Sequence, residues 1–215
     1  MTSSCNQATT TVATTTVQSI TSAPAGAIVF NENTYFVNTA VLNEGANFRI
    51  DWNYTTEDIT FRITASTTGW VGFGLSPNGG MFNSDIILAW TNSAGGVEFK
   101  DAHVESSTTV LYDSVQNWEK LYYSRLNGVT TVIFKRKNII CNPDQPSNEI
   151  NIDVSPSSYV IYAWGNNFNN GLPAYHQNNR GSRSLPLLAA LNQKVVLNMN
   201  EVETADFRVN VRIQI

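Results

Sequence analysis

The sequence is poor in charge, cysteine and histidine, and it has no long apolar run. Only 14% of its 215 residues are charged, against about 25% in ordinary soluble domains, and the net charge is −4. We therefore expect no binding of nucleic acid or of an anionic membrane through a basic surface. No apolar run reaches the roughly 18 residues of a membrane span. Asn, Thr and Ser form about a third of the chain, a composition that indicates a secreted, extracellular protein.

Cysteine and histidine are too scarce for several kinds of site. Cys5 and Cys141 allow one internal disulfide at most and exclude a thiolate zinc cage. His103 and His176 are too few for a copper monooxygenase centre or a three-histidine zinc site, unless carboxylates complete the ligand set. The sequence also has no Gly-x-Ser-x-Gly nucleophile motif and no glycine-rich phosphate loop. These shortages predict a protein that is not an enzyme.

The chain divides into a tail and one domain. Residues 1–27 are uncharged and rich in Thr, which is typical of a tail or linker. Thr and Val also favour strands, so this segment would become a donor strand if a sheet edge accepted it. Residues 28–215 are expected to form a single domain, because β-sandwiches of this size often fold as one unit.

Hydrophobic patterning beyond the tail predicts strands. Apolar and polar residues alternate as in half-buried strands at 48–54, 59–64, 129–136 and 207–215. Continuous apolar runs at 70–75 and 86–90 are typical of central strands covered on both faces. Further strands are expected near 97–103, 120–126 and 159–164, and a short helical turn at 185–192. Strands at this spacing, separated by Gly and Asn turns, predict an all-β antiparallel sandwich.

Two rare side chains suggest a metal-ligand pair. Met81 follows two glycines between two expected buried strands, and His176 lies in a polar turn late in the chain. Met and His together form a recognised axial pair for haem iron. Arg180 and Arg183 follow His176 closely enough to pair with haem propionates. Taken alone, however, a single Met is usually a packing residue and a single loop His is usually solvated.

A succession of motifs resembles the DOMON domain, in the version found in dopamine β-monooxygenase-like proteins. The first motif is Gly69–Met81 running into Ser84–Trp90, and the resemblance extends over roughly 40–215. The later motifs are Lys100–His103, Asp113–Trp118, Phe134–Arg136, Cys141–Asp144, Tyr175–His176 and Arg180–Leu185. The resemblance implies an immunoglobulin-like β-sandwich, in agreement with the strand pattern. The catalytic copper domains of those monooxygenases have no counterpart here, so we expect no hydroxylase activity.

The resemblance implies two ligands. Cytochrome-type DOMON domains hold haem b between a Met and a His, and Met81 and His176 match those positions. The monooxygenase relatives imply a site for Ca²⁺ or another hard cation, formed here by Asp85, Asn117 and the carbonyls of Ile86 and Ala102.

One residue of the implied cation site departs from the family pattern. Asn117 stands where a second Asp is expected, and a neutral amide weakens the attraction for Ca²⁺. The alternative for Asp85 is a carboxylate that accepts hydrogen bonds from loop amides.

Other DOMON domains imply sugar binding as a further alternative. Exposed aromatic rings would stack on a sugar, and the candidates are Trp118, Tyr122, Tyr123 and Trp164. Their strand positions favour a place in the core instead.

The cysteines are interpreted through the same resemblance. In the monooxygenase relatives, the Cys that matches Cys141 pairs with a Cys in a region absent here, which leaves Cys5 as its partner. If residues 9–20 pair with their own sandwich, the disulfide is internal. If they pair with the next molecule, strand addition builds a fibre held by intermolecular bonds.

The sequence as a whole predicts a secreted, non-catalytic module that binds haem b for electron transfer or redox sensing, with a redox partner. A structural or adhesive module that self-associates through its tail is one alternative. A carbohydrate-binding module is the other.

Overall fold

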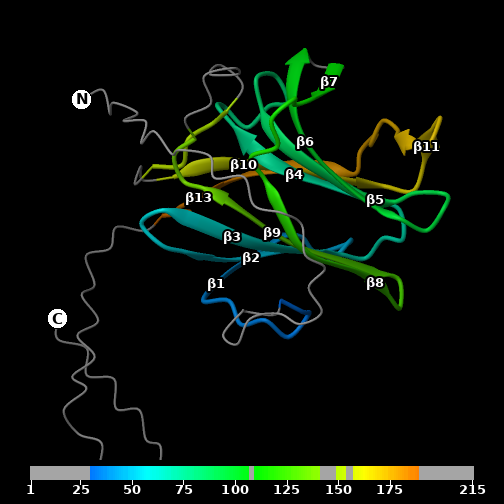
Figure 1. Ribbon diagram of the computed structural model, residues 1–215, viewed down its shortest axis with the longest axis horizontal. Coiled ribbons are helices and arrows are strands. Elements are labelled where there is room, and N and C mark those ends of the chain that lie inside the picture. Colours follow the sequence, from blue (N-terminus) through cyan, green and yellow to red (C-terminus); the bar gives the residue numbers. More distant parts are fainter. Residues whose placement is uncertain (1–29, 107–108, 141–148, 154–156, 189–215) are drawn as a thin grey trace, which may run out of the picture.

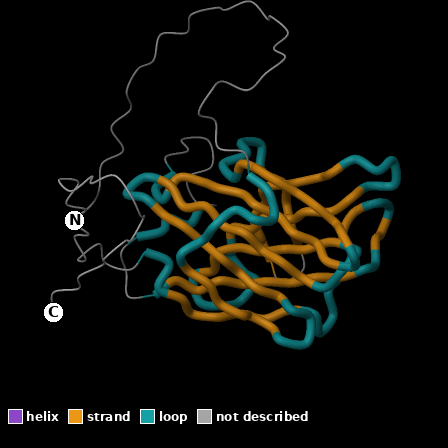
Figure 2. Tube along the Cα trace, turned by 90° about the horizontal axis from the view of Figure 1, so that it is seen from below, coloured by secondary structure: helices purple, strands orange, loops and turns teal. Residues whose placement is uncertain are grey.

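A computed structural model of the chain describes residues 30–106, 109–140, 149–153 and 157–188. All regular structure in these residues is β-strand, and Figure 2 draws them without a helix. The strands form two antiparallel sheets, which Figure 1 shows as two layers facing each other. The all-β sandwich expected from the sequence is therefore confirmed. No helix capable of crossing a membrane occurs in the described residues.

The first sheet has five strands, and alternating burial fixes its orientation. Its order is β1 (Asn38–Asn43), β2 (Phe48–Tyr54), β3 (Asp58–Ala65), β9 (Val129–Lys137) and β8 (Glu119–Leu126). In β3, every second side chain is buried, as expected of a strand with one face on the core. Asn127 and Gly128 join β8 to β9 with φ angles of 52° and 80°, the left-handed values that a two-residue hairpin turn requires.

The second sheet has six strands, and its middle is buried on both faces. Its order is β13 (Arg180–Leu185), β10 (Ser158–Gly165), β4 (Trp70–Ser76), β5 (Asp85–Thr91), β6 (Val97–Ser106) and β7 (Thr109–Tyr112). Every residue of β4 is buried, which confirms the interpretation of its continuous apolar run. A small separate hairpin consists of β11 (Phe168–Asn169) and β12 (Leu172–Pro173).

The main core lies between the sheets and is rich in aromatic rings. Phe61 and Phe134 of the five-stranded sheet pack against Phe73 of the six-stranded sheet, with ring centroids 5.2 and 5.8 Å from that of Phe73. The ring of Trp118 lies edge-on to Phe134 at 5.4 Å. A smaller apolar cluster contains Ile86, Ala102, Val104 and Ile161, with Met81 and Leu88 packed against it.

Successive side chains of one strand point to opposite faces of a sheet. In β5, Ile87 belongs to the main core, whereas its neighbour Ile86 belongs to the smaller cluster. The six-stranded sheet therefore has an inner face toward the other sheet and an outer face that carries Ile86, Ala102 and Ile161.

Some sequence predictions need correction. The helical turn expected at 185–192 is wrong over its described part, because Leu185 ends β13 and Leu187 and Leu188 form a buried bend. The strands β1, β7 and β13 were not predicted, and all three lie at sheet edges, where partial burial weakens the apolar pattern. The tail 1–27 and the strand expected at 207–215 lie outside the described residues.

Candidate functional site

A cavity of about 1060 Å³ opens on the outer face of the six-stranded sheet, a size in the range of cofactor sites. Its lining is mainly apolar and includes Trp70, Ile86, Leu88 and Ile161. Gly72 lies in the lining as well, and a Cβ atom there would lie 3.0 Å from the side chain of Leu88. The glycine therefore keeps this wall of the cavity hollow.

Met81 lines the cavity from the loop between β4 and β5. The hydroxyls of Ser76 and Ser84 both donate to the carbonyl oxygen of Gly80, at 2.6 and 2.8 Å. The amide of Gly79 donates to the Ser76 hydroxyl at 2.9 Å. These three bonds fix the backbone just before Met81, whose side chain packs on the outer-face cluster.

His176 lines the same cavity from the segment between β12 and β13. Its Nδ1 lies 3.0 Å from the carbonyl oxygen of Gln177, so the tautomer that donates from Nδ1 leaves the Nε2 lone pair for a ligand. Burial lowers the pKa of the imidazole, which favours the neutral, metal-binding form. The structure thus brings the predicted pair, Met81 and His176, to one cavity.

The two arginines predicted to meet propionates have different places. Arg180 lines the cavity, and its Nη1 donates to the hydroxyl of Tyr175 at 2.7 Å. Arg183 is not part of the lining and donates instead to the carbonyl oxygen of Val41 in β1. The odd separation of the two residues along β13 explains this, because it directs them to opposite faces of the sheet.

The residues of the implied cation site lie near the inner face, where they already have partners. Asp85 accepts hydrogen bonds from Trp118 Nε1 at 2.8 Å and from the amide of Ile150 at 3.3 Å, and it forms a buried ion pair with Arg136. Its carboxylate is therefore balanced by a guanidinium.

The other three implied ligands lie close to Asp85. Ile86 and Ala102 are opposite each other in the β5–β6 ladder. The amide nitrogen of the Asn117 side chain donates to Glu149 Oε1 at 2.6 Å.

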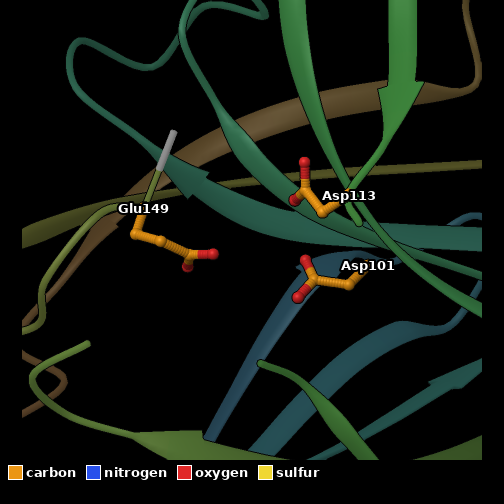
Figure 3. A group of neighbouring side chains, drawn as sticks. All are labelled: Asp101, Asp113 and Glu149. Atoms are coloured by element: carbon orange, nitrogen blue, oxygen red, sulfur yellow. The ribbon is translucent and has the colours of Figure 1, made fainter. Parts of the chain in front are cut away.

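A group of carboxylates beside this region was not predicted. Asp101 in β6, Asp113 after β7 and Glu149 ahead of β10 place one oxygen each within 4.8 Å of the others (Figure 3). Burial, with the charge of Asp85 next, raises the pKa of Asp101 to about 8 and that of Glu149 to about 7. Burial also raises the pKa of Asp113. Asp101 and Asp113 each lie in one of the DOMON-like motifs, but no single motif joins the three residues.

The aromatic residues considered for sugar stacking are not exposed. Trp118 is buried in the core, and Tyr123 and Trp164 pack against it. The half-buried Tyr122 donates its hydroxyl to Glu32 at 2.5 Å. Three of the four rings therefore belong to the core or pack against it, and Tyr122 is held through its hydroxyl. Cys5 and Cys141 lie outside the described residues.

The chain is similar to curated proteins much longer than itself. DBH-like monooxygenase protein 1 of Gallus gallus is 31% identical over 161 residues, which cover 71% of this chain and 24% of that protein. The Homo sapiens protein of the same name is 30% identical over 158 residues, which cover 72% of this chain and 24% of that protein. The chain thus spans about a quarter of the length of these relatives.

Two solved structures share the fold at low sequence identity. The cytochrome domain of Myriococcum thermophilum cellobiose dehydrogenase has a TM-score of 0.55 and 15% identity, over 71% of this chain and 85% of that chain. The cytochrome b domain of pyranose dehydrogenase from Coprinopsis cinerea has a TM-score of 0.50 and 12% identity, over 66% and 77%. A family model of the DOMON domain matches residues 44–165, more than half of the chain. The resemblance read from the motifs is confirmed, and the chain belongs to the DOMON domain family.

Proposed function

We propose that this DOMON domain binds haem b between Met81 and His176 and serves electron transfer as a non-catalytic module of a secreted protein. The observation that carries the proposal is that these two residues, far apart in the sequence, line one cavity. The chain has only three Met and two His, and one of each forms a recognised axial pair for haem iron. The two cytochrome domains with the same fold support the proposal.

The volume and the lining of the cavity are compatible with haem b. Its volume of about 1060 Å³ is sufficient for a cofactor, and most of its lining is apolar, as a porphyrin face requires. The hydrogen bond from His176 Nδ1 to Gln177 orients the ring and leaves Nε2 as the ligating atom. Arg180 supplies a positive charge at the cavity for a propionate, so only this arginine of the predicted pair belongs to the proposed ligand set.

Bound haem would supply one-electron transfer. Met81 offers a thioether sulfur, a soft ligand that favours reduced iron and raises the reduction potential. The apolar outer-face cluster around Met81 excludes water and lowers the local dielectric constant, which acts in the same direction. The serine bonds to Gly80 hold the backbone just before Met81 in place, which would keep the sulfur positioned for the iron.

The monooxygenase relatives do not argue for hydroxylase activity in this chain, because the matched region is about a quarter of their length. We infer instead that the domain passes electrons to a separate partner.

Absorption spectroscopy of the purified chain reconstituted with haem tests the proposal. We expect a Soret band and the sharp reduced bands of a low-spin, six-coordinate haem. His176→Ala should abolish this spectrum, and Met81→Ala should open a coordination position and lower the reduction potential. His103→Gln is the matched control, since His103 is not part of the cavity lining, and it should keep the spectrum. Absence of a Soret band, or a spectrum unchanged by His176→Ala, would overturn the proposal.

A further inference from the structure

The strand β7, at one edge of the six-stranded sheet, is exposed and apolar. Val110, Leu111 and Tyr112 are 36%, 40% and 42% exposed, and no residue of β7 carries a charge. Figure 1 shows β7 at the margin of the molecule, with no described strand beyond it. Proteins usually protect an edge strand with charged side chains or a covering segment, because an open apolar edge recruits another strand. The edge of β7 is therefore a candidate interaction surface.

The other three edge strands are protected. Three charged side chains lie on β8 and two on β13. The edge of β1 has no charge, but the opposite sheet covers it. The carbonyl oxygen of Val41 accepts from Arg183, and that of Leu42 accepts from the hydroxyl of Tyr162 at 2.6 Å. Among the described edge strands, β7 thus has the least protection.

The backbone direction of β7 can be read from its ladder with β6. The amide of Asp113 donates to the carbonyl oxygen of Asp101 in β6 at 3.0 Å. In an antiparallel ladder, the N–H and C=O groups of one residue point to the same side, and successive residues alternate. Leu111, two residues before Asp113, therefore faces β6. Val110 and Tyr112 direct their N–H and C=O groups to the open side.

This open side is complementary to itself. Val110 and Tyr112 lie symmetrically about Leu111, so a two-fold axis at Leu111 places Val110 of one copy opposite Tyr112 of the other. At these positions the two residues can exchange both backbone hydrogen bonds, and a branched side chain faces an aromatic ring, a favourable cross-strand pair. Leu111 then faces Leu111 of the second copy, with no like charges to oppose the contact.

We propose that β7 is a dimer interface, at which two copies of this chain join their six-stranded sheets through antiparallel pairing of β7 with β7 about Leu111. The occupant is a second copy because one two-fold axis satisfies the outward backbone groups of both strands. Such an interface uses the same surface on both copies, so it closes at two chains and does not grow into a fibre.

The open edge is short, which limits the strength of the dimer. Beyond Tyr112 the chain returns toward β6, where Asp113 and the side chain of Gln116 bond to the backbone of Asp101. Only the four residues of β7 are left for pairing. Small interfaces belong to weak and transient complexes, so we expect a dimer that dissociates in the micromolar range.

The pairing also affects the cavity on the outer face. Val110 and Tyr112 both line the cavity, so their side chains lie on the outer face of the sheet. In the joined sheet, the cavities of the two copies open on the same face, with their β7 walls next to each other. The second copy covers part of Tyr112 and shields this wall from water. The interface itself is made of backbone and side chains, and it forms with or without a ligand in the cavity.

Sedimentation velocity of the full chain over a range of concentrations tests the interface. The parent should change from monomer to dimer as its concentration rises through the micromolar range. Leu111→Lys should remove the dimer, because two like charges would then face each other at the axis. Leu126→Lys is the matched control, since Leu126 is an exposed apolar residue of the edge strand β8, and it should dimerise as the parent does.

A cysteine cross-link tests the register independently. In a non-hydrogen-bonded pair the Cα atoms lie about 4.5 Å apart, within the range that a disulfide spans. Leu111→Cys should therefore give a disulfide between the introduced cysteines of two copies, identified by mass spectrometry of the linked peptides. Thr109→Cys should give none, because the same register separates the two Thr109 Cα atoms by about 13 Å.

Three outcomes would overturn the inference. The first is a monomer at every concentration. The second is a dimer that persists in Leu111→Lys, whose fold circular dichroism checks; if that variant does not fold, the cross-link decides alone. The third is a disulfide from position 111 to Cys5 or to another position, which would assign the edge to a different occupant. All three measurements are made without haem, so this inference and the proposed function fail independently.

Discussion

Neighbouring residues of β5 and β6 face opposite sides of the six-stranded sheet and meet different surroundings. On the outer face, Ile86 and Ala102 belong to an apolar cluster beside a cavity that has few charges in its lining. On the inner face, Asp85 and Asp101 are buried among other carboxylates. One residue step along each strand therefore separates an apolar cavity wall from a cluster of buried carboxyl groups.

The two faces also differ in how they relate to folding. The outer cavity reduces the stability of the fold only slightly, because an apolar surface left open to solvent carries a modest free-energy cost. The inner cluster is costly, because its charges are removed from water and only partly paired. Changes on the inner face should therefore alter stability first, and changes on the outer face should alter ligand binding first.

The largest effect is expected from the buried ion pair. Arg136→Met removes the guanidinium that pairs with Asp85 and lies 3.9 Å from Glu149, and it should cost about 3–5 kcal/mol of unfolding free energy in urea titrations. Lys135→Met is the control, because the pair of Lys135 with Glu119 is exposed and is worth about 1 kcal/mol or less. Equal losses in the two variants would contradict the contrast between the faces.

An intermediate effect is expected from pH in the metal-free protein. Burial, with the charge of Asp85, raises the pKa of Asp101 to about 8 and that of Glu149 to about 7. The folded state then holds more protons on these two groups than the unfolded state, so their contribution to stability is fully present below about pH 4 and is lost as the pH rises through about 8. The groups that face these two carboxyls are Asp85, Asp113, His103 and Arg136.

Urea titrations from pH 4 to 8 in chelator check this prediction. Stability that rises with pH in chelator would show that these groups are not held in their protonated form.

The smallest effect is expected from the two arginines of β13. Arg180→Gln removes the positive charge at the cavity and should weaken haem binding about tenfold, the value of one charge-assisted hydrogen bond on a partly solvated rim. Arg183→Gln should leave haem binding unchanged, because Arg183 bonds to Val41 away from the cavity. Titration of each variant with haem, followed at the Soret band, measures the difference. If both variants bind alike, Arg180 is not a propionate partner.

Most of the fold could be predicted because its central strands carry their own patterns. Ile59, Phe61 and Ile63 alternate with polar residues, and the β4 run is apolar throughout. The strand β13 could not be predicted in this way, because Arg-Gly-Ser-Arg-Ser-Leu contains one buried apolar side chain. It is held through its ladder with β10 rather than by a buried face of its own.

The two candidate sites differed in predictability for a chemical reason. Met81 and His176 could be singled out because Met and His are rare in this chain. Asp101, Asp113 and Glu149 could not, because they belong to 17 acidic residues and come from separate segments. Only the packing of these segments against β6 brings them together.

Gln116 has a consequence for assembly. Its side-chain amide accepts from the Asp101 nitrogen at 2.8 Å and donates to the Asp101 oxygen at 3.0 Å, as a peptide group of a neighbouring strand would do. The Gln116 side-chain amide thus takes the place of a backbone peptide group where the β6–β7 ladder ends, at Ala102 and Tyr112. The edge of the six-stranded sheet is capped at this point, because the backbone N–H and C=O groups of Asp101 are already bonded and cannot pair with an added strand. Growth by strand addition would instead use the outer edge of β7 or the edge strands β1, β8 and β13.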